Sequence, residues 1–392
     1  MSPAARQDAL RVAVVGAGGF GGWPALELLR RGARVTLIDA WGPGNPRASS
    51  GGETRVIRAT YGSHGVYTRM AARAQALWRA HEARHGVELM RVTGALWMFA
   101  RADPFIAASA GALAGQGLAF DELSVSDARR RFPQIDFTGM VSVYVEPEAG
   151  YLRARDACAH VVRCFVAEGG TYLQGQVPPP VVDGALRLLT LADGRTIEAD
   201  AFVFAPGPWM GALFPDVVGA LVEPTRQEVY YFGTPAGDAP FAEDRLPIWL
   251  DFGDRFIYGI PGPAGGGFKV ADDTPGPPID PTTADRTPDP AGVAAMRAFV
   301  SRRFPALAEA PLIRSEVCQY ESTPDSHFIL DRHPRAPNVV LAGGGSGHGF
   351  KMGPAVGEIV ADLALGESEP DPQFRLGRFD APPAGGWRTK WS

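Results

Sequence analysis

A glycine-rich turn near the start of the chain carries residues that could hold a dinucleotide. Gly16, Gly18 and Gly21 fit the pattern G-x-G-x-x-G directly after a short β-branched run, and Asp39 ends the next such run. The glycines let backbone N–H groups approach a pyrophosphate at the positive end of a helix, and an acid at this spacing can bind a ribose hydroxyl. The alternative is a glycine-rich turn without a ligand. The motif by itself does not distinguish NAD from FAD.

Lysine is so rare in this chain that its positions are informative. The 38 basic residues include only three lysines, Lys269, Lys351 and Lys390, and arginine supplies the other 35. A lysine inside the fold is therefore less expected to be a generic surface charge. Its ammonium is compact, sits on a flexible stem, and has a pKa that shifts readily. Lys269 and Lys351 are accordingly candidates for chemistry, against the alternative of surface lysines.

The elements that position the glycine-rich turn form a β-α-β unit. Short β-branched runs at 11–15 and 34–38 predict strands, and the apolar spacing between them predicts a helix. Pro24 lies beyond the first helical position, so we expect this helix to begin late or to be kinked. Further strands are predicted over 196–205 and 338–342, and the second of these leads through a glycine-rich loop into a helix.

The middle of the chain has a different pattern of residues. Between 222 and 273, short apolar runs alternate with glycine and proline, which predicts an antiparallel meander. We therefore predict an α/β plus α+β fold, with a discontinuous Rossmann-like domain and a second, mainly antiparallel β-sheet domain that covers it. The predicted boundaries are 1–90, 150–215 and 320–385 for the first domain, 91–149 and 216–319 for the second, and 386–392 for a tail.

Composition narrows the class of protein. The 392 residues are 45% hydrophobic and 21% charged, which allows a sizeable core, and the formal charge of -5 argues against nucleic acid or an anionic membrane as a partner. Three cysteines are an odd number, so we expect no disulfide scaffold and a reducing cytoplasm. We also expect no signal peptide and no membrane span. We assign no metal site from the sequence.

An ordered series of short motifs extends over nearly the whole chain. These are G-E-T-R-V-I-R at 52–58, T-G-A-L at 93–96, E-P-x-x-G at 146–150, A-P-G-P-W at 205–209, R-Q-E-V at 226–229, G-F-K at 267–269, V-C-Q-Y at 317–320, H-F-I-L-D at 327–331 and G-S-G-H-G-F-K at 345–351. The series resembles the D-amino-acid-oxidase superfamily of flavoproteins, in its sarcosine oxidase and N-methyltryptophan oxidase branch. The resemblance implies an FAD-binding domain, an antiparallel substrate domain, and oxidation of C–N bonds in amino acids.

The resemblance also implies which residues contact FAD. Cys318 matches a cysteine that forms a thioether to the flavin 8α-methyl carbon, although a lone cysteine is by itself more often a small buried hydrophobe. Arg55 would lie near the flavin ring, unless it forms a salt bridge with Glu53 or Asp39. The residues expected to contact FAD are Gly16, Gly18, Phe20, Gly21, Asp39, Thr54, Arg55, Trp209, Cys318, Gly345, Ser346, Gly347, His348 (through its backbone), Gly349 and Lys351.

Other motif positions imply roles toward oxygen and substrate. Lys269 matches a lysine that lies over the flavin face and promotes reaction with oxygen, where an ammonium would stabilise developing negative charge. Arg58 and Lys351 match the pair that binds the substrate carboxylate, although Arg58 could instead form a buried structural ion pair. Tyr258 and Tyr320 match tyrosines around the substrate, and as plain sequence they could equally belong to the core.

Two positions depart from the resembling enzymes. Asp273, with Asp272 beside it, stands four residues after Lys269, where the sarcosine oxidases have a histidine, and Gly51 stands where a histidine usually precedes G-E-T-R. These changes put sarcosine itself in doubt and favour a larger or more cationic substrate. Asp273 either pairs with a nearby arginine or receives a positive group of the substrate.

The sequence therefore predicts a cytoplasmic, FAD-dependent oxidase of a secondary or N-substituted amino acid, which forms an imine and reduces oxygen to hydrogen peroxide. The expected partners are a small amino-acid substrate and oxygen, and the expected state is a monomer or a small homo-oligomer. The alternatives are a primary amino-acid oxidase, a dehydrogenase with another electron acceptor, and a non-catalytic dinucleotide-binding module. A flavin monooxygenase ranks below these because we find no second G-x-G-x-x-G for NADPH.

Overall fold

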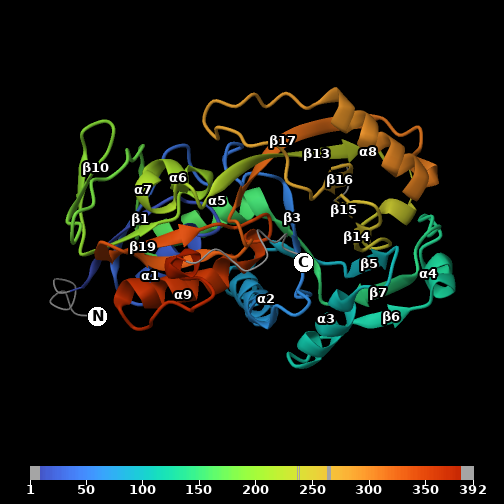
Figure 1. Cartoon of the computed structure of the whole chain (residues 1–392), viewed down its shortest axis with the longest axis horizontal. Coiled ribbons are helices and arrows are strands. Elements are labelled where there is room, and N and C mark those ends of the chain that lie inside the picture. The colour runs from blue at the N-terminus through green and yellow to red at the C-terminus, as the bar shows by residue number, and fades with distance from the viewer. Residues whose placement is uncertain (1–8, 236, 238, 263–265, 381–392) are drawn as a thin grey trace.

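Two large sheets form the two halves of the protein. The structure, a computed structural model, describes residues 9–235, 237, 239–262 and 266–380. Figure 1 shows a six-stranded sheet with its helices on the left and an eight-stranded sheet on the right. The predicted tail at 386–392 and Lys390 lie outside the described residues. The predicted domain boundaries stay a prediction.

The six-stranded sheet contains the predicted β-α-β unit. Its strands, in order across the sheet, are β18 (Ile329–His333), β19 (Ala336–Gly343), β12 (Ala201–Phe204), β1 (Arg11–Val15), β2 (Arg34–Asp39) and β9 (Thr171–Gln174). Neighbouring strands are parallel except β18 and β19, which pair in antiparallel fashion. This mainly parallel sheet, together with the antiparallel sheet described below, confirms the predicted mixed fold class.

Alternation along β1 divides the side chains of this sheet between two apolar cores. Val12 and Val14 share one core with the helices α1 (Gly22–Arg30), α2 (Gly65–His85), α5 (Ala154–Ala167) and α9 (Gly353–Leu365). Ala13 and Val15 share the other core with β10 (Leu188–Thr190), β11 (Thr196–Glu198), α6 (Met210–Leu213) and α7 (Pro215–Val218). Successive residues of a strand point to opposite faces, so both faces of this sheet are covered.

The eight-stranded sheet contains the predicted meander. Its strands, in order, are β17 (Leu312–Ser322), β13 (Glu223–Phe232), β16 (Phe268–Asp272), β15 (Phe256–Ile260), β14 (Ile248–Phe252), β5 (Ala95–Phe99), β7 (Ser142–Glu146) and β6 (Asp121–Leu123). All neighbours are antiparallel except β14 and β5. The helix α8 (Pro290–Arg303) packs on this sheet through Phe299 and Val300. Two more helices, α3 (Pro104–Ala114) and α4 (Val125–Arg131), lie at its β6 end (Figure 1).

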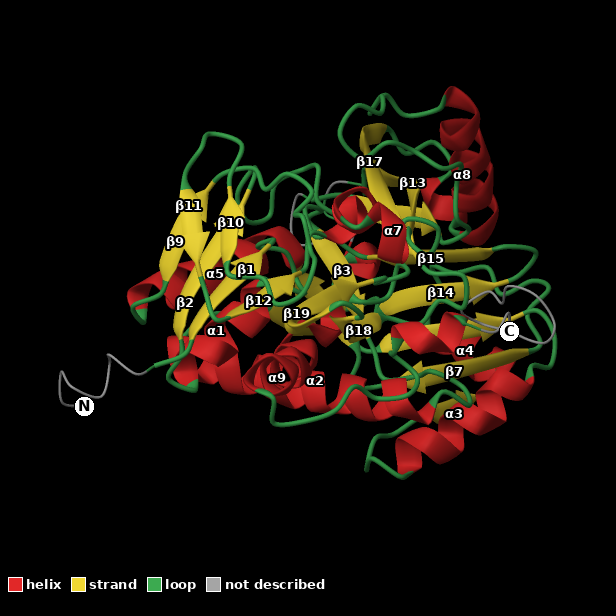
Figure 2. Ribbon diagram, turned by 60° about the vertical axis from the view of Figure 1, so that its left-hand side comes forward, coloured by secondary structure: helices red, strands yellow, loops and turns green. Residues whose placement is uncertain are grey.

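A small third sheet joins the halves. It consists of β3 (Thr54–Ile57), β8 (Gly150–Arg153) and β4 (Met90–Val92), and Figure 2 shows β3 between the two large sheets. The G-E-T-R-V-I-R motif therefore lies where the halves meet. Within the described residues, no helix has both the length and the apolar character needed to cross a membrane.

Two local expectations have instructive outcomes. Pro24 is the third residue of α1, which begins late as predicted, at Gly22. Proline is tolerated there because the first N–H groups of a helix have no intrahelical acceptor. The single strand predicted over 196–205 is wrong, because β11 and β12 belong to different sheets. Asp200 separates them: its backbone N–H donates to the Arg11 carbonyl at 2.8 Å, which directs the chain into pairing with β1.

Candidate active site

A cavity of about 390 Å³ opens at the carboxyl end of β1. The predicted residues that line it are Gly16, Gly18, Phe20, Asp39, Arg55, Trp209, Gly345, Gly347 and Gly349. Its volume is in the range of small-molecule sites, and the carboxyl ends of parallel strands are where such α/β sheets bind ligands. Residues more than 300 positions apart in the sequence thus meet at one cavity.

The glycines of the first motif are required by close approach of the backbone. Gly16 has φ +102°, and a Cβ there would lie 2.1 Å from the Ala205 carbonyl oxygen. A Cβ on Gly21 would lie 1.8 Å from the carbonyl oxygen of Gly16, so Gly21 lies behind the turn rather than at the cavity wall. The N-terminus of α1 has no side-chain cap, and its first N–H, that of Gly22, donates to the Gly18 carbonyl at 2.9 Å.

Asp39 is held in place at the end of β2. Its carboxylate accepts hydrogen bonds from the backbone N–H groups of Ala17 at 2.8 Å, Trp41 at 2.9 Å and Gly42 at 2.7 Å. The ring of Trp209 lies 4.7 Å from that of Trp41 at the same cavity. This fixed acid beside a glycine turn is the arrangement that the motif predicts for binding a ribose.

A smaller cavity of about 60 Å³ adjoins the first, since both are lined by Arg55, Tyr320, Gly347 and Phe350. The other predicted residues that line it are Arg58, Tyr258, Asp273, Cys318, His348 and Lys351. The structure therefore collects the predicted flavin-ring and substrate residues around one space. Thr54, Lys269 and Ser346 are buried but line neither cavity.

Arg55 contacts the sulfur of Cys318. Its Nη2 lies 3.2 Å from Cys318 Sγ and donates to the Ser49 carbonyl at 2.6 Å. Glu53, one of the two acids considered as partners of Arg55, pairs with Arg314 instead. Cys318 is partly exposed at the cavity rather than a buried core residue. The cavity wall therefore brings the sulfur of Cys318 and the guanidinium of Arg55 together.

Lys269 is a buried residue near Arg55 and Cys318. It is 2% exposed, and its Nζ donates to the Thr54 carbonyl at 2.8 Å. Burial, together with the charge of Arg55, lowers the pKa of Lys269 to about 7. A surface position for Lys269 is wrong, because β16 pairs with strands on both sides in the middle of the sheet.

Arg58 and Lys351 converge on Tyr61. The Arg58 guanidinium lies 4.4 Å from the centre of the Tyr61 ring and 5.2 Å from that of Trp97, while burial lowers its pKa. Lys351 Nζ donates to the Tyr61 hydroxyl at 3.0 Å and to the His348 carbonyl at 2.7 Å. The two cations are 3% and 4% exposed, so their charges act in a place of low water content. Tyr61 is a positioning residue that the sequence did not single out.

Asp272 is the last residue of β16 and Asp273 follows it, and their two carboxylates have different environments. Asp272 forms an ion pair with Arg255 at 2.5 Å. Asp273 lines the small cavity, where it accepts a hydrogen bond from the Tyr320 hydroxyl at 2.8 Å. Burial and the nearby Asp273 raise the pKa of Tyr258 to about 12. Arg58 also lies near enough for the charge of Asp273 to act on it, which opposes the lowering of the Arg58 pKa by burial.

Glu321 is a cavity residue that the sequence analysis missed. It lines the large cavity, is 8% exposed, and accepts from the Gly345 N–H at 3.3 Å through Oε1. Its Oε2 has no hydrogen-bond partner among the described residues, and burial raises the pKa of Glu321 to about 7. The sequence offered one signal for Glu321, its position as an acid directly after V-C-Q-Y.

The pKa of Glu321 predicts a pH dependence of stability in protein produced without FAD. Its folded-state pKa of about 7 lies above the ordinary value of 4.5, so the folded protein binds the proton more tightly. The resulting stabilisation is complete below about pH 4.5 and is lost as pH rises through 7, a change of about 3 kcal/mol. Denaturant unfolding between pH 4.5 and 8 would measure it.

The unmodified protein would be compared with Glu321→Gln, whose side chain has a similar shape but cannot ionise. The free energy of unfolding of Glu321→Gln should fall less steeply with rising pH. Glu316→Gln, on the same strand but partly exposed, is the matched control and should keep the slope of the unmodified protein. Equal slopes for Glu321→Gln and the unmodified protein would contradict the prediction.

Comparison with known families decides which dinucleotide the cavity serves. The sequence model of the family described as DAO, FAD dependent oxidoreductase, matches residues 11–363. The chain belongs to this family. The monomeric sarcosine oxidase of Streptomyces avermitilis is 35% identical over 379 residues, which cover 94% of this chain and 96% of that protein. The N-methyl-L-tryptophan oxidase of Salmonella arizonae is 28% identical, covering 93% and 98%.

Solved structures share the fold of this FAD-dependent oxidoreductase. The L-proline dehydrogenase from P. horikoshii superposes with a TM-score of 0.83 at 22% identity, over 95% of this chain and 98% of that one. The predicted family, enzyme class and FAD dependence are confirmed. The residues of the cavity fit FAD. The glycines leave room for a phosphate near the α1 N-terminus, and Asp39 is held where an acid can bind a ribose hydroxyl.

Proposed function

We propose that this FAD-dependent oxidoreductase is a cytoplasmic oxidase of a secondary or N-substituted amino acid, which forms an imine and hydrogen peroxide. The observation that carries the proposal is the pair of buried cations, Arg58 and Lys351, at the small cavity beside the FAD cavity. The sarcosine and N-methyltryptophan oxidase relatives support the substrate class. The three unpaired cysteines support a reducing compartment. We propose a monomer or small homo-oligomer.

The chain's own residues bind and orient the substrate. The Arg58 fork lies over the rings of Tyr61 and Trp97 and suits two carboxylate oxygens, and Lys351 adds a point charge at the Tyr61 hydroxyl. When bound, FAD supplies the acceptor for the hydride removed from the C–H bond beside the nitrogen. A substrate that binds as a neutral amine then requires no acid–base residue, only positioning.

A panel of amino acids tests the proposal. Peroxide formation and oxygen uptake would be measured with sarcosine, N-methyl-L-tryptophan and L-proline, and with the matching primary amino acids. We expect one peroxide per oxygen consumed and a preference for the N-substituted or cyclic compounds. Preference for primary amino acids would favour a primary amino-acid oxidase. Reduction of an artificial acceptor without reaction with oxygen would favour a dehydrogenase.

We further propose that Cys318 attaches the FAD covalently through a thioether. Cys318 is partly exposed at the small cavity, and its sulfur lies 3.2 Å from Arg55 Nη2. The protein precipitated with acid is expected to stay yellow, and Cys318→Ala is expected to release its FAD. Cys158→Ala, at a buried cysteine of α5, is the matched control and should keep the colour in the pellet. A colourless pellet from the unmodified holoenzyme would leave Cys318 without this role.

Asp273 is expected to recognise a positive group of the substrate. Asp273 and Asp272 both line the small cavity, but Asp273 accepts a hydrogen bond from Tyr320 whereas Asp272 is paired with Arg255. In the variant Asp273→Asn, kcat/KM for amino acids with cationic side chains should fall roughly tenfold or more relative to neutral ones. Asp272→Asn is the control and should not discriminate. Equal losses on both substrate classes would make Asp273 a structural residue.

A further inference from the structure

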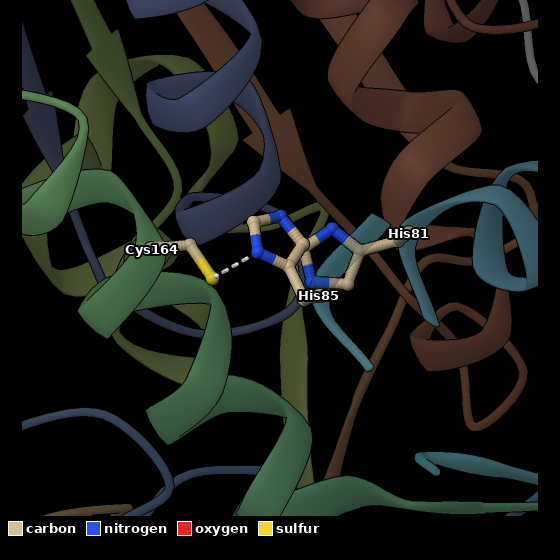
Figure 3. A group of neighbouring side chains, drawn as sticks. All are labelled: His81, His85 and Cys164. Carbon is tan, nitrogen blue, oxygen red and sulfur yellow. Dashed lines mark hydrogen bonds between the residues drawn. The ribbon is translucent and has the colours of Figure 1, made fainter. Parts of the chain in front are cut away.

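Two helices of the six-stranded half present four metal-ligating side chains to each other. His81 and His85 lie on α2, and His160 and Cys164 lie on α5. Each pair is separated by four residues, so its members project from the same helix face on successive turns. Figure 3 shows His81, His85 and Cys164 pointing toward one another. None of the four lines either cavity described above.

The distances within this cluster suit a tetrahedral ion. Cys164 Sγ lies 3.6 Å from His85 Nδ1 and 3.3 Å from His160 Nε2. Zinc bonds to nitrogen and sulfur place neighbouring ligand atoms about 3.3–3.6 Å apart. One ligand atom each from His81, His85 and Cys164 lies within 4.8 Å of the others, and the rings of His81 and His160 are 5.2 Å apart. His160 does not belong to the group whose ligand atoms all lie within 4.8 Å of one another, so its side chain would have to move to become the fourth ligand.

His81 is the second, independent observation. It is 4% exposed, and within the described part of the chain neither of its ring nitrogens has a hydrogen-bond partner. Buried polar groups without a partner are uncommon and call for a ligand or another explanation. Burial and the adjacent His85 and His160 lower the pKa of His81 to about 3, so the ring is neutral, as metal binding requires.

We propose that His81, His85, His160 and Cys164 form a structural Zn²⁺ site that fastens α2 to α5. Three imidazoles and one thiolate are borderline-soft donors, and four protein ligands leave no open position, which is typical of structural rather than catalytic zinc. On binding, the Cys164 thiol loses its proton to solvent and its sulfur bonds the ion. No electron is transferred.

Charged residues surround the cluster. Arg30 Nη2 lies 3.3 Å from His85 Nε2, and because a guanidinium only donates, this nitrogen is the acceptor. Glu168 pairs with Arg30 at 2.6 Å, and its Oε1 lies 4.0 Å from His85 Nε2, beyond hydrogen-bond distance. The Cys164 thiolate and Glu168 would offset two of the three positive charges of the ion and Arg30.

Metal titration of the FAD-loaded protein tests the proposal. After treatment with a chelator, the protein would be titrated with Zn²⁺ and, separately, with Co²⁺. We expect one equivalent of zinc to bind and to raise the thermal midpoint. We expect Co²⁺ to give the intense ligand-field bands of a tetrahedral ion, at wavelengths beyond flavin absorption, and a thiolate charge-transfer band. These readouts do not depend on enzyme activity.

Variants separate this site from adventitious binding. Cys164→Ser should weaken zinc binding by more than the roughly 10–100-fold caused by losing an outer partner of a metal site. The control Cys158→Ser, on the same helix, should bind zinc like the unmodified protein. Should Cys164→Ser fail to fold, His160→Asn alters a partly exposed ring and gives the same comparison. Unchanged zinc affinity in Cys164→Ser or His160→Asn, or an octahedral Co²⁺ spectrum, would overturn the proposal.

Discussion

The variant Lys269→Met is expected to react with oxygen roughly a hundredfold more slowly than the unmodified enzyme, once both have been reduced by substrate. Methionine keeps most of the buried volume but removes the ammonium, which would stabilise negative charge developing on oxygen. The measurement is stopped-flow mixing of reduced enzyme with oxygenated buffer. Anaerobic reduction by substrate should change much less, because Lys269 does not line the substrate cavity.

The environment of Lys269 adds a pH test to this prediction. Burial and Arg55 lower its pKa to about 7, so the fraction of ammonium falls as pH rises through this region. Bound FAD, an anion, favours the ammonium and moves this window upward. Oxygen reactivity should therefore decline with rising pH in the unmodified enzyme and stay flat in Lys269→Met. Identical oxygen reactivity and pH profiles in the two proteins would show that Lys269 has no such role.

The variant Arg58→Ala is expected to raise the apparent KM for the amino-acid substrate by one to three orders of magnitude. Removing one of two buried cations that bind a carboxylate loses about 2–5 kcal/mol, because less positive charge offsets the burial of the anion. Lys351 would then be the single cation that binds the substrate carboxylate. Steady-state kinetics on Arg58→Ala, with flavin content and thermal midpoint measured in parallel, would give the effect on binding separately from an effect on folding.

Decarboxylated substrate analogues provide the matched comparison. They should be poor substrates for the unmodified enzyme and should lose little further in Arg58→Ala, because they lack the group that Arg58 binds. Arg58→Lys should recover only part of the loss, since an ammonium cannot reproduce the planar fork that stacks on Tyr61 and Trp97. Good turnover of simple amines without a carboxylate would refute the carboxylate-binding role of Arg58 and Lys351.

Several features of this protein follow from local sequence. The strand at 11–15, the glycine turn and Asp39 were predictable because each depends on neighbours in the chain: periodicity, φ above zero at Gly16, and the spacing of a β-α-β unit. The antiparallel meander was predictable from short runs separated by glycine and proline. The ordered motifs extended this to the family, the FAD dependence, and many of the residues that line the two cavities. The roles of those residues stay predictions.

Tertiary structure alone decided the rest, because it concerns which faces meet. The sequence shows that His81 and His85, like His160 and Cys164, share a helix face, but only packing of α2 against α5 brings the two faces together. Likewise, alternation along β17 does not tell which cavity Glu321 reaches, or that burial would raise its pKa. Such contacts join residues separated by scores of positions, and their energies depend on burial and charge from several elements. Local sequence patterns determine whether a segment forms a helix or a strand. The environment of each side chain is determined only when the helices and strands pack together.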